Sequence, residues 1–230
     1  MAVVMHGLGG SKKQLHIRTM INTLKKNNYN VVSFDTTNTF GESDGNYSDA
    51  TVTNYREDLE DVVSWTTDNF RYKDQLLLAG HSIGGLSISL FAEKYPEKVK
   101  ALAPISTIVS GKLWKQTQDK KMLEDWKREG IWTREAKDPK NGARKVLKWT
   151  FAKDIMQYDL LKNIDQLTMP VLLIVGDKDP TAIVSHQQIL FDKLPGRKEL
   201  HIIKNAGHVF HEKNHINEID DILSKWLNKI

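Results

Sequence analysis

The sequence predicts an α/β fold, a mostly parallel sheet flanked by helices, and two observations support this prediction. Short apolar runs typical of buried strands alternate along the 230 residues with amphipathic stretches of helical period. One of these runs leads directly into a Gly-x-Ser-x-Gly motif at 80–84, which a helical pattern follows. Alternating strands and helices favour a parallel sheet because parallel neighbours need a crossover, usually a helix.

The apolar runs and the periodic stretches locate the expected elements. Strands are expected at residues 2–5, 31–34, 76–79, 99–105, 171–175 and 200–203. In the expected helices, apolar residues recur every three or four positions, at 12–27, around 55–65, at 86–95 and around 216–226. A sheet of about six strands lies within the usual size range of open sheets.

Residues 107–165 interrupt this alternation. They lie between two expected strands and contain several helical stretches, more than one crossover needs. Between 107 and 150 there are twelve Lys or Arg and six Asp or Glu, and the segment holds four of the six tryptophans, Trp114, Trp126, Trp132 and Trp149. We interpret 1–106 and 166–230 as the core domain and 107–165 as a helical lid whose tryptophans bind substrate. For any single tryptophan, the alternative is packing within the lid.

The composition is that of an ordinary globular protein and excludes several classes. No apolar run approaches the roughly 18 residues of a membrane span. The absence of cysteine excludes disulfides and a thiolate nucleophile, and it suits the cytoplasm, where we expect the protein. The formal charge of +4 is mild and no nucleic-acid motif accompanies it, so we expect neither a nucleic-acid nor a membrane partner.

Ser82 is the candidate nucleophile. It lies between an expected strand and an expected helix, and the glycines two residues before and after it leave room for a strained turn. The N-terminus of the following helix would direct free N–H groups toward the serine, which favours developing negative charge. In this context the motif predicts a nucleophile elbow.

A serine nucleophile needs a base, and His208 is the candidate. It follows the last expected strand, and histidine as a residue type titrates in the range that suits a general base at neutral pH. The alternative is a buried histidine bonded to backbone. Asp177 or Asp179, both in the loop after the strand at 171–175, would orient the imidazole, which gives the chain order Ser, Asp, His expected after a nucleophile elbow.

Two backbone N–H groups are expected to form an oxyanion hole. Ile83 directly follows the nucleophile, and Leu8 lies in the stretch His6-Gly7-Leu8-Gly9-Gly10 after the first expected strand. A glycine-rich turn before a helix could instead hold a phosphate. The stretch lacks both the Lys-Ser ending of a P-loop and the G-x-G-x-x-G spacing, which disfavours that alternative.

These motifs resemble those of the α/β-hydrolases, and within that superfamily the chain is similar to small carboxylesterases of the feruloyl/cinnamoyl type. The resemblance rests on five stretches in the family order, at residues 6–10, 41–45, 80–85, 176–179 and 207–208. It implies Asp179, rather than Asp177, as the acid, and Leu8 and Ile83 as oxyanion donors. It also implies a helical lid inserted after the strand that follows the elbow helix.

The chain departs from the family pattern in two places. The antiparallel strands that usually precede the first strand are missing, because the first expected strand begins at Ala2. This leaves an exposed sheet edge, and a homodimer is one way to cover it. Aryl esterases often have a second histidine before this glycine, Gly41, where this chain has Phe40, and this difference weakens the transfer of the family's substrate choice to this chain.

The stretch His211-Glu212-Lys213-Asn214-His215 matches the zinc-peptidase motif H-E-x-x-H. A catalytic zinc site needs both histidines on one helical face and a third protein ligand. The match lies at the start of the last expected helix, and no third ligand is suggested. We therefore expect neither a metal nor another cofactor.

Together these residues predict a serine hydrolase that cleaves a small-molecule carboxylic ester, with aryl esters of the feruloyl type as one class. Ser82, Asp179 and His208 would carry the reaction through an acyl-enzyme. Two alternatives stay open, an aminopeptidase or amidase on the same scaffold and a non-catalytic binding module that keeps the pocket.

Overall fold

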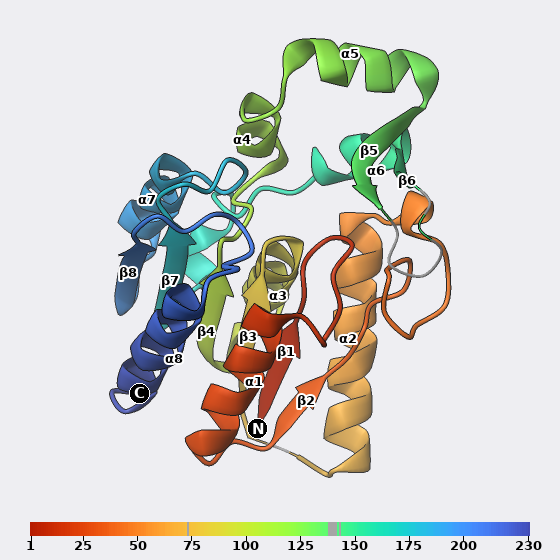
Figure 1. Cartoon of the computed structure of the whole chain (residues 1–230). Coiled ribbons are helices and arrows are strands. Elements are labelled where there is room, and N and C mark those ends of the chain that lie inside the picture. Colours follow the sequence, from red (N-terminus) through yellow and green to blue (C-terminus); the bar gives the residue numbers. More distant parts are fainter. Residues whose placement is uncertain (73, 138–141, 143) are drawn as a thin grey trace.

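A parallel sheet forms the centre of the computed structural model, which describes residues 1–72, 74–137, 142 and 144–230 (Figure 1). Within these residues, six strands pair in the order β2-β1-β3-β4-β7-β8, and every pairing is parallel. The strands are β1 (Ala2–Met5), β2 (Val31–Ser33), β3 (Leu76–His81), β4 (Val99–Ile105), β7 (Val171–Gly176) and β8 (Lys198–Ile203). The predicted sheet of about six mostly parallel strands is confirmed.

Helices cover both faces of this sheet. Successive side chains of a strand point to opposite faces, so Val4 of β1 belongs to a core cluster that includes residues of α1 and α8, whereas Val3 belongs to one that includes residues of α2, α3 and α7. The helices are α1 (Leu15–Lys26), α2 (Val52–Asn69), α3 (Ile83–Lys94), α7 (Val184–Lys193) and α8 (Lys213–Leu227). Short 3-10 helices lie in the connections, η1 (Tyr47–Asp49), η2 (Pro96–Lys98) and η3 (Ile164–Gln166). None of the helices in the described ranges is long and apolar enough to cross a membrane.

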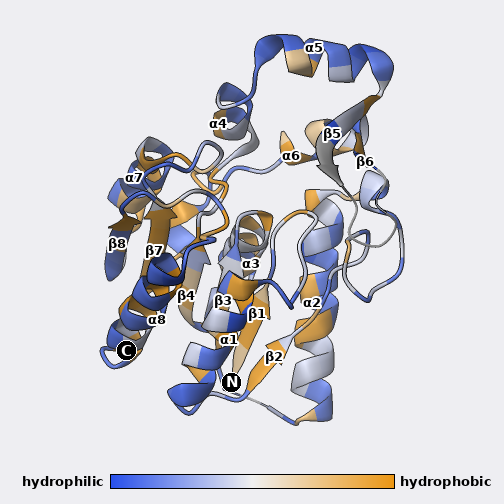
Figure 2. Ribbon diagram, in the orientation of Figure 1, coloured by the Kyte–Doolittle hydropathy of each residue, from blue (hydrophilic) through white to orange (hydrophobic). Residues whose placement is uncertain are grey.

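The central strands β3 and β7 are buried at every position. Because helices cover both faces of a parallel sheet, such strands are apolar throughout rather than alternating. Figure 2 shows hydrophobic residues along these strands and hydrophilic residues on the outer sides of the helices. The carboxyl ends of all six strands lie at one edge, where ligands usually bind in open α/β sheets.

We call residues 107–165 the insertion and the rest of the chain the body; the helices and strands that the structure describes between residues 111 and 155 lie above this edge in Figure 1. The ends of the insertion pair at its base, where Gly111 N donates to Tyr158 O (2.9 Å) and Leu160 N donates to Val109 O (3.0 Å). Its elements are α4 (Gly111–Gln116), α5 (Lys120–Glu129), β5 (Ile131–Lys137), β6 (Arg144–Lys148) and α6 (Trp149–Ile155). The domain division at 106 and 166 stays a prediction.

The antiparallel pair of β5 and β6 differs from the predicted helical lid. Trp132 pairs with Leu147 and Thr133 pairs with Val146. Tryptophan, threonine and valine favour strands, and strand alternation places Trp132 and Arg134 on one side. The insertion is therefore part helix and part sheet.

Polar contacts join the insertion to the body at η1 and at the start of α2. Arg134 Nη1 donates to Tyr47 Oη (3.2 Å), and Lys148 forms an ion pair with Asp49. The carboxylate of Asp154 accepts a hydrogen bond from the backbone of α2 (3.0 Å). These contacts hold β5, β6 and α6 against one side of the body.

Candidate active site

The turn between β3 and α3 holds Ser82 at the carboxyl edge of the sheet. Ser82 has φ 57° and ψ −118°, a conformation that residues with a side chain rarely adopt and that costs of order 1–3 kcal/mol. Gly84 lets α3 approach β1 closely, because a Cβ at this position would lie 2.4 Å from the carbonyl oxygen of His6. The Gly-x-Ser-x-Gly motif therefore forms a sharp strand-to-helix turn with the serine at its tip.

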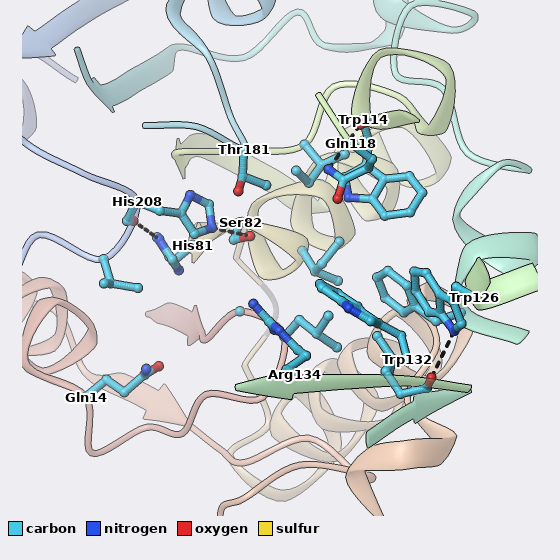
Figure 3. A pocket seen from close by; sticks show the side chains of 17 residues that line it. Gln14, His81, Ser82, Trp114, Gln118, Trp126, Trp132, Arg134, Thr181 and His208 are labelled. Atoms are coloured by element: carbon cyan, nitrogen blue, oxygen red, sulfur yellow. Dashed lines mark hydrogen bonds between the residues drawn. The ribbon is translucent and has the colours of Figure 1, made fainter. Parts of the chain in front are cut away.

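Three of the candidate residues form one hydrogen-bonded chain. His208 Nε2 lies 2.9 Å from Ser82 Oγ, a contact that Figure 3 shows, and His208 Nδ1 lies 2.8 Å from Asp179 Oδ2. Asp177, the other acid that the sequence left open, is exposed. When Nδ1–H donates to the carboxylate, Nε2 can accept the serine proton. Such a chain can activate a serine hydroxyl as a nucleophile.

The carboxylate of Asp179 is held by several donors. Its Oδ1 accepts hydrogen bonds from the backbone N–H groups of Thr181 and Ala182, both at 2.9 Å. Burial alone would raise the pKa of Asp179, but the hydrogen bond and charge of His208 and these backbone donors lower the pKa below its ordinary value. The group is therefore ionised at neutral pH and can stabilise an imidazolium.

Two further histidines pack behind His208. His81 Nε2 donates to the carbonyl oxygen of His208 (2.7 Å), and the two rings lie 4.8 Å apart. The ring of His16 lies 4.4 Å from that of His81. Burial lowers the pKa of His81 well below its ordinary value and the pKa of His16 to about 3, so both rings are neutral at neutral pH. His81 therefore fixes the backbone of the loop that carries His208.

The loop after β1 lies beside Ser82. A Cβ on Gly7 would lie 3.0 Å from Ser82 Cβ, and Gly7 O accepts a hydrogen bond from Tyr55 Oη (2.9 Å) that holds the loop. Leu8 and Ile83, the two expected oxyanion donors, both line the pocket around Ser82. Neither backbone N–H donates to an acceptor within the described residues. Both groups are therefore available to a substrate oxygen.

A cavity of about 200 Å³ lies next to Ser82, between the body and the insertion (Figure 3). Of the four candidate tryptophans, Trp114, Trp126 and Trp132 line it, and Trp149 does not. Trp126 is 1% exposed and its Nε1 donates to Leu147 O (2.9 Å). Trp149 packs edge-on against Trp126, with ring centroids 5.4 Å apart. Trp149 thus supports Trp126 from behind instead of lining the cavity.

Comparison with known families agrees with this geometry. A family model described as serine aminopeptidase, S33 matches residues 1–214, which include the body up to the start of α8 and the whole insertion. The chain belongs to this family. Its fold is that of the α/β-hydrolases, as the sequence resemblance implied.

Curated relatives of this serine aminopeptidase S33 member include palmitoyl-protein thioesterases. The mitochondrial palmitoyl-protein thioesterase ABHD10 of Bos taurus is 28% identical over 195 residues, and that of Homo sapiens is 26% identical over 191 residues. Each match covers 80% of this chain and 60% of the relative. The chain thus spans about 60% of the length of these relatives.

Solved structures show the same fold. Alpha/beta hydrolase domain-containing protein 10 from mouse superposes with a TM-score of 0.78 at 24% identity, covering 99% of this chain and 90% of that chain. Est1E from Butyrivibrio proteoclasticus with bound ferulic acid also gives a TM-score of 0.78, at 22% identity, covering 99% of this chain and 88% of that chain. At these identities the likeness is one of fold.

Besides Ser82 and the histidines, four polar residues line the cavity that were not predicted from the sequence as site residues, namely Gln14, Gln118, Arg134 and Thr181. Arg134 follows Trp132 at strand spacing, so recognition of the strand would have placed both side chains on one face. Gln118 and Thr181 lie in loops after α4 and β7, where no local pattern marks them.

His211 and His215 do not share a helical face. Helix α8 begins at Lys213, so His211 precedes it, whereas His215 lies within it and is 2% exposed. The described ranges contain no group of three His, Cys, Asp or Glu residues placed to hold a metal ion. These two histidines therefore do not form the paired helical ligands that the zinc motif requires.

Proposed function

We propose that this protein is a serine hydrolase that cleaves carboxylic esters of small molecules through an acyl-enzyme. The observation that supports this proposal most is the hydrogen-bonded chain from Asp179 through His208 to Ser82. The names of the curated relatives add thioesters as a related class of acyl substrate. Both classes present the same acyl carbon to a serine nucleophile.

In the first half of the reaction, Ser82 Oγ attacks the acyl carbon while His208 Nε2 takes the hydroxyl proton. Asp179 stabilises the imidazolium that forms. The substrate carbonyl oxygen becomes an oxyanion, to which the N–H groups of Leu8 and Ile83 donate hydrogen bonds. The bond to the alcohol oxygen then breaks, and the alcohol leaves with the proton from His208.

In the second half, water replaces the alcohol. His208 takes a proton from the water, and the hydroxide adds to the acyl carbon of the acyl-enzyme. The same two N–H groups bind the second oxyanion. The bond to Ser82 Oγ breaks, the serine recovers its proton from His208, and the carboxylic acid leaves. This scheme uses no metal and no cofactor.

The same residues can in principle cleave amides, and the family description names an aminopeptidase. An aminopeptidase has to hold the α-ammonium group of its substrate, for which a carboxylate is the natural partner. The cavity-lining residues of the described chain include no Asp or Glu, and Arg134 would repel an ammonium group. This charge pattern favours esters over aminopeptidase substrates.

A fluorophosphonate tests the nucleophile, since it reacts covalently with activated serines. We expect intact-protein mass spectrometry to show one adduct on wild type and on Ser64→Ala, which changes an exposed serine of α2. Ser82→Ala should show none. An adduct that persists in Ser82→Ala, or no adduct on folded wild type, would contradict the proposal, and the second result would favour a binding module.

Matched substrates test the bond that is cleaved. We expect turnover of 4-nitrophenyl butyrate and little turnover of 4-nitrobutyranilide, which carries the same acyl group on an amide. Faster release from amino-acid 4-nitroanilides would favour the aminopeptidase instead. We further propose that the substrate is a small molecule and that the protein acts in the cytoplasm. We also propose that two copies of the chain pair at an open edge of the sheet, a homodimer that light scattering would detect.

A further inference from the structure

Arg134 places a positive charge in the cavity next to Ser82. It lies on β5, two residues after Trp132, and both side chains line the cavity. Figure 3 shows the guanidinium of Arg134 and the indole of Trp132 projecting from the insertion into the space that Ser82 and His208 border. Arg134 Cζ lies 5.0 Å from the centroid of the Trp132 ring. The stacked ring fixes the direction of the guanidinium.

The charge of Arg134 has no acidic partner within the described residues. Its one hydrogen bond there is the 3.2 Å contact to the hydroxyl of Tyr47, although a guanidinium has five N–H donors. Two other cations of the insertion have acidic partners, Arg128 with Asp125 and Lys148 with Asp49. Arg134 differs from these two in lining the pocket with donors that have no partner among the described residues.

The remaining lining does not neutralise this charge. The described lining residues include no Asp or Glu, and apart from histidine Arg134 is their single ionisable side chain. Most of the rest are aromatic or aliphatic, among them Trp114, Trp126 and Phe151. A cation with unfilled donors in an apolar pocket favours an anionic ligand, because charge-assisted hydrogen bonds strengthen as water is excluded.

We propose that Arg134 binds a carboxylate of the substrate, so that the enzyme selects esters or thioesters that carry a second, anionic group beside an apolar or aromatic portion. This inference rests on the proposed function of Ser82. Here Arg134 is a specificity-determining residue that takes no part in proton transfer. The competing interpretation is that Arg134 only ties β5 to η1 through Tyr47.

Matched substrate pairs test the selectivity. On the acyl side, mono-4-nitrophenyl glutarate is compared with 4-nitrophenyl glutaramate, which has the same shape without the charge. On the alcohol side, the acetyl ester of 4-hydroxybenzoate is compared with that of 4-hydroxybenzamide. We expect wild type to prefer the charged member of one pair by about tenfold or more in kcat/KM. The pair that responds identifies the part of the substrate that reaches Arg134.

Three variants separate binding from a structural tie. Arg134→Gln should bring the charged-to-neutral ratio close to one, whereas Arg144→Gln, an exposed arginine of the same hairpin, should keep the wild-type ratio. Tyr47→Phe removes the hydroxyl that Arg134 contacts and should keep the preference if the guanidinium serves the substrate. A ratio near one in wild type for both pairs, or a preference that survives in Arg134→Gln, would overturn the proposal.

A binding measurement makes the result independent of turnover. In Ser82→Ala protein, titration of tryptophan fluorescence should show benzoate binding at least about tenfold tighter than benzamide. In the double variant Ser82→Ala/Arg134→Gln, benzoate and benzamide should bind equally tightly. The oxyanion donors are present in both the single and the double variant, so the loss of the difference would be due to Arg134. Equal benzoate affinity with and without Arg134 would overturn the inference. Failure of the proposed function would instead appear as absent labelling of Ser82 while the benzoate difference persists.

Discussion

The body and the insertion of this hydrolase are stabilised in different ways. In the body, parallel strands pair along their length and the central strands are fully buried, and backbone N–H groups hold the side chain of the candidate acid, Asp179. In the insertion, four aromatic rings pack in a row: Trp132 contacts Trp126, Trp126 contacts Phe151, and Phe151 contacts Trp114. A few polar contacts then join the insertion to η1 and α2.

From this difference we expect the body to determine the rate of the reaction and the insertion to determine which substrates are accepted. The body positions the proposed nucleophile, base and acid, whereas the insertion supplies most of the apolar cavity wall and Arg134. We therefore expect substitutions in the body to lower kcat for every ester. Substitutions in the insertion should change the ranking of esters instead.

The largest effect is expected at Asp179 in the body. Asp179→Asn removes the charge that orients and stabilises the imidazole of His208, so kcat should fall by about 10³–10⁴-fold for every ester tested. Asp177→Asn is the matched control, because Asp177 lies in the same loop but is exposed. Steady-state kinetics checks both variants. Equal losses in the two would show that the loop, and not the contact with His208, matters.

A second contrast uses the same substitution in the two regions. In Gly84→Ala the new methyl group would meet the carbonyl oxygen of His6 at 2.4 Å, so the free energy of unfolding should fall by about 3 kcal/mol or more. Gly130 ends α5 with φ 76° and has no heavy atom near its would-be Cβ. Gly130→Ala should therefore cost only about 1 kcal/mol, from the left-handed backbone. Urea unfolding that reverses this order would refute the contrast.

A pH-dependent effect is expected from Glu93, which lies on α3. It is 8% exposed, and burial, with the nearby charge of Asp159, raises its pKa to about 8. Between pH 4.5 and about pH 8 the folded state keeps a proton that the unfolded state has lost, so the free energy of unfolding falls as pH rises. Relative to Glu93→Gln, which does not titrate, the free energy of unfolding of wild type should fall by about 4 kcal/mol between about pH 5 and 9.

The control for this measurement is Glu97→Gln, which changes an exposed glutamate just after α3. It should keep the pH dependence of wild type. Thermal unfolding across the pH range gives the comparison. If Glu93→Gln has the same pH dependence as wild type, then Glu93 is not protonated in the folded protein at neutral pH.

The smallest effect is expected at the ion pair between Lys148 of β6 and Asp49 of η1. The two side chains are 49% and 42% exposed, so water screens their attraction. Lys148→Met should change the free energy of unfolding by less than about 0.5 kcal/mol, and less still in high salt. A loss above about 1 kcal/mol would show that charge, rather than aromatic packing, holds the hairpin.

The proximity of the three candidate catalytic residues could be predicted because each follows a strand of a parallel sheet. Ser82, Asp179 and His208 follow β3, β7 and β8, whose carboxyl ends lie at one edge. The residues alone left Asp177 and Asp179 open, since both lie in one loop and only the folded turn buries one of them. The family resemblance pointed to the buried one.

The cavity wall was harder to predict because its pattern is weak in the sequence. Trp132 and Arg134 are two residues apart, which is the spacing of side chains on one face of a strand, and Asn141-Gly142 is a dipeptide favoured in hairpin turns. The many charged residues between Arg134 and Asn141 obscure this strand pattern. The contact of His81 with His208 joins positions 127 residues apart, so no local pattern could reveal it. The fully buried strands β3 and β7 were predictable from their apolar runs, whereas the charge-rich strands β5 and β6 were not.

The backbone conformation of Ser82 has a consequence for attempts to make the protein heat-resistant. Glycine adopts φ 57° with little strain, so Ser82→Gly should relieve part of the 1–3 kcal/mol of strain expected for a residue with a side chain. A mutant library screened for survival at high temperature alone would therefore enrich a replacement that abolishes the proposed chemistry. Directed evolution of this chain has to score ester turnover in every round of heating.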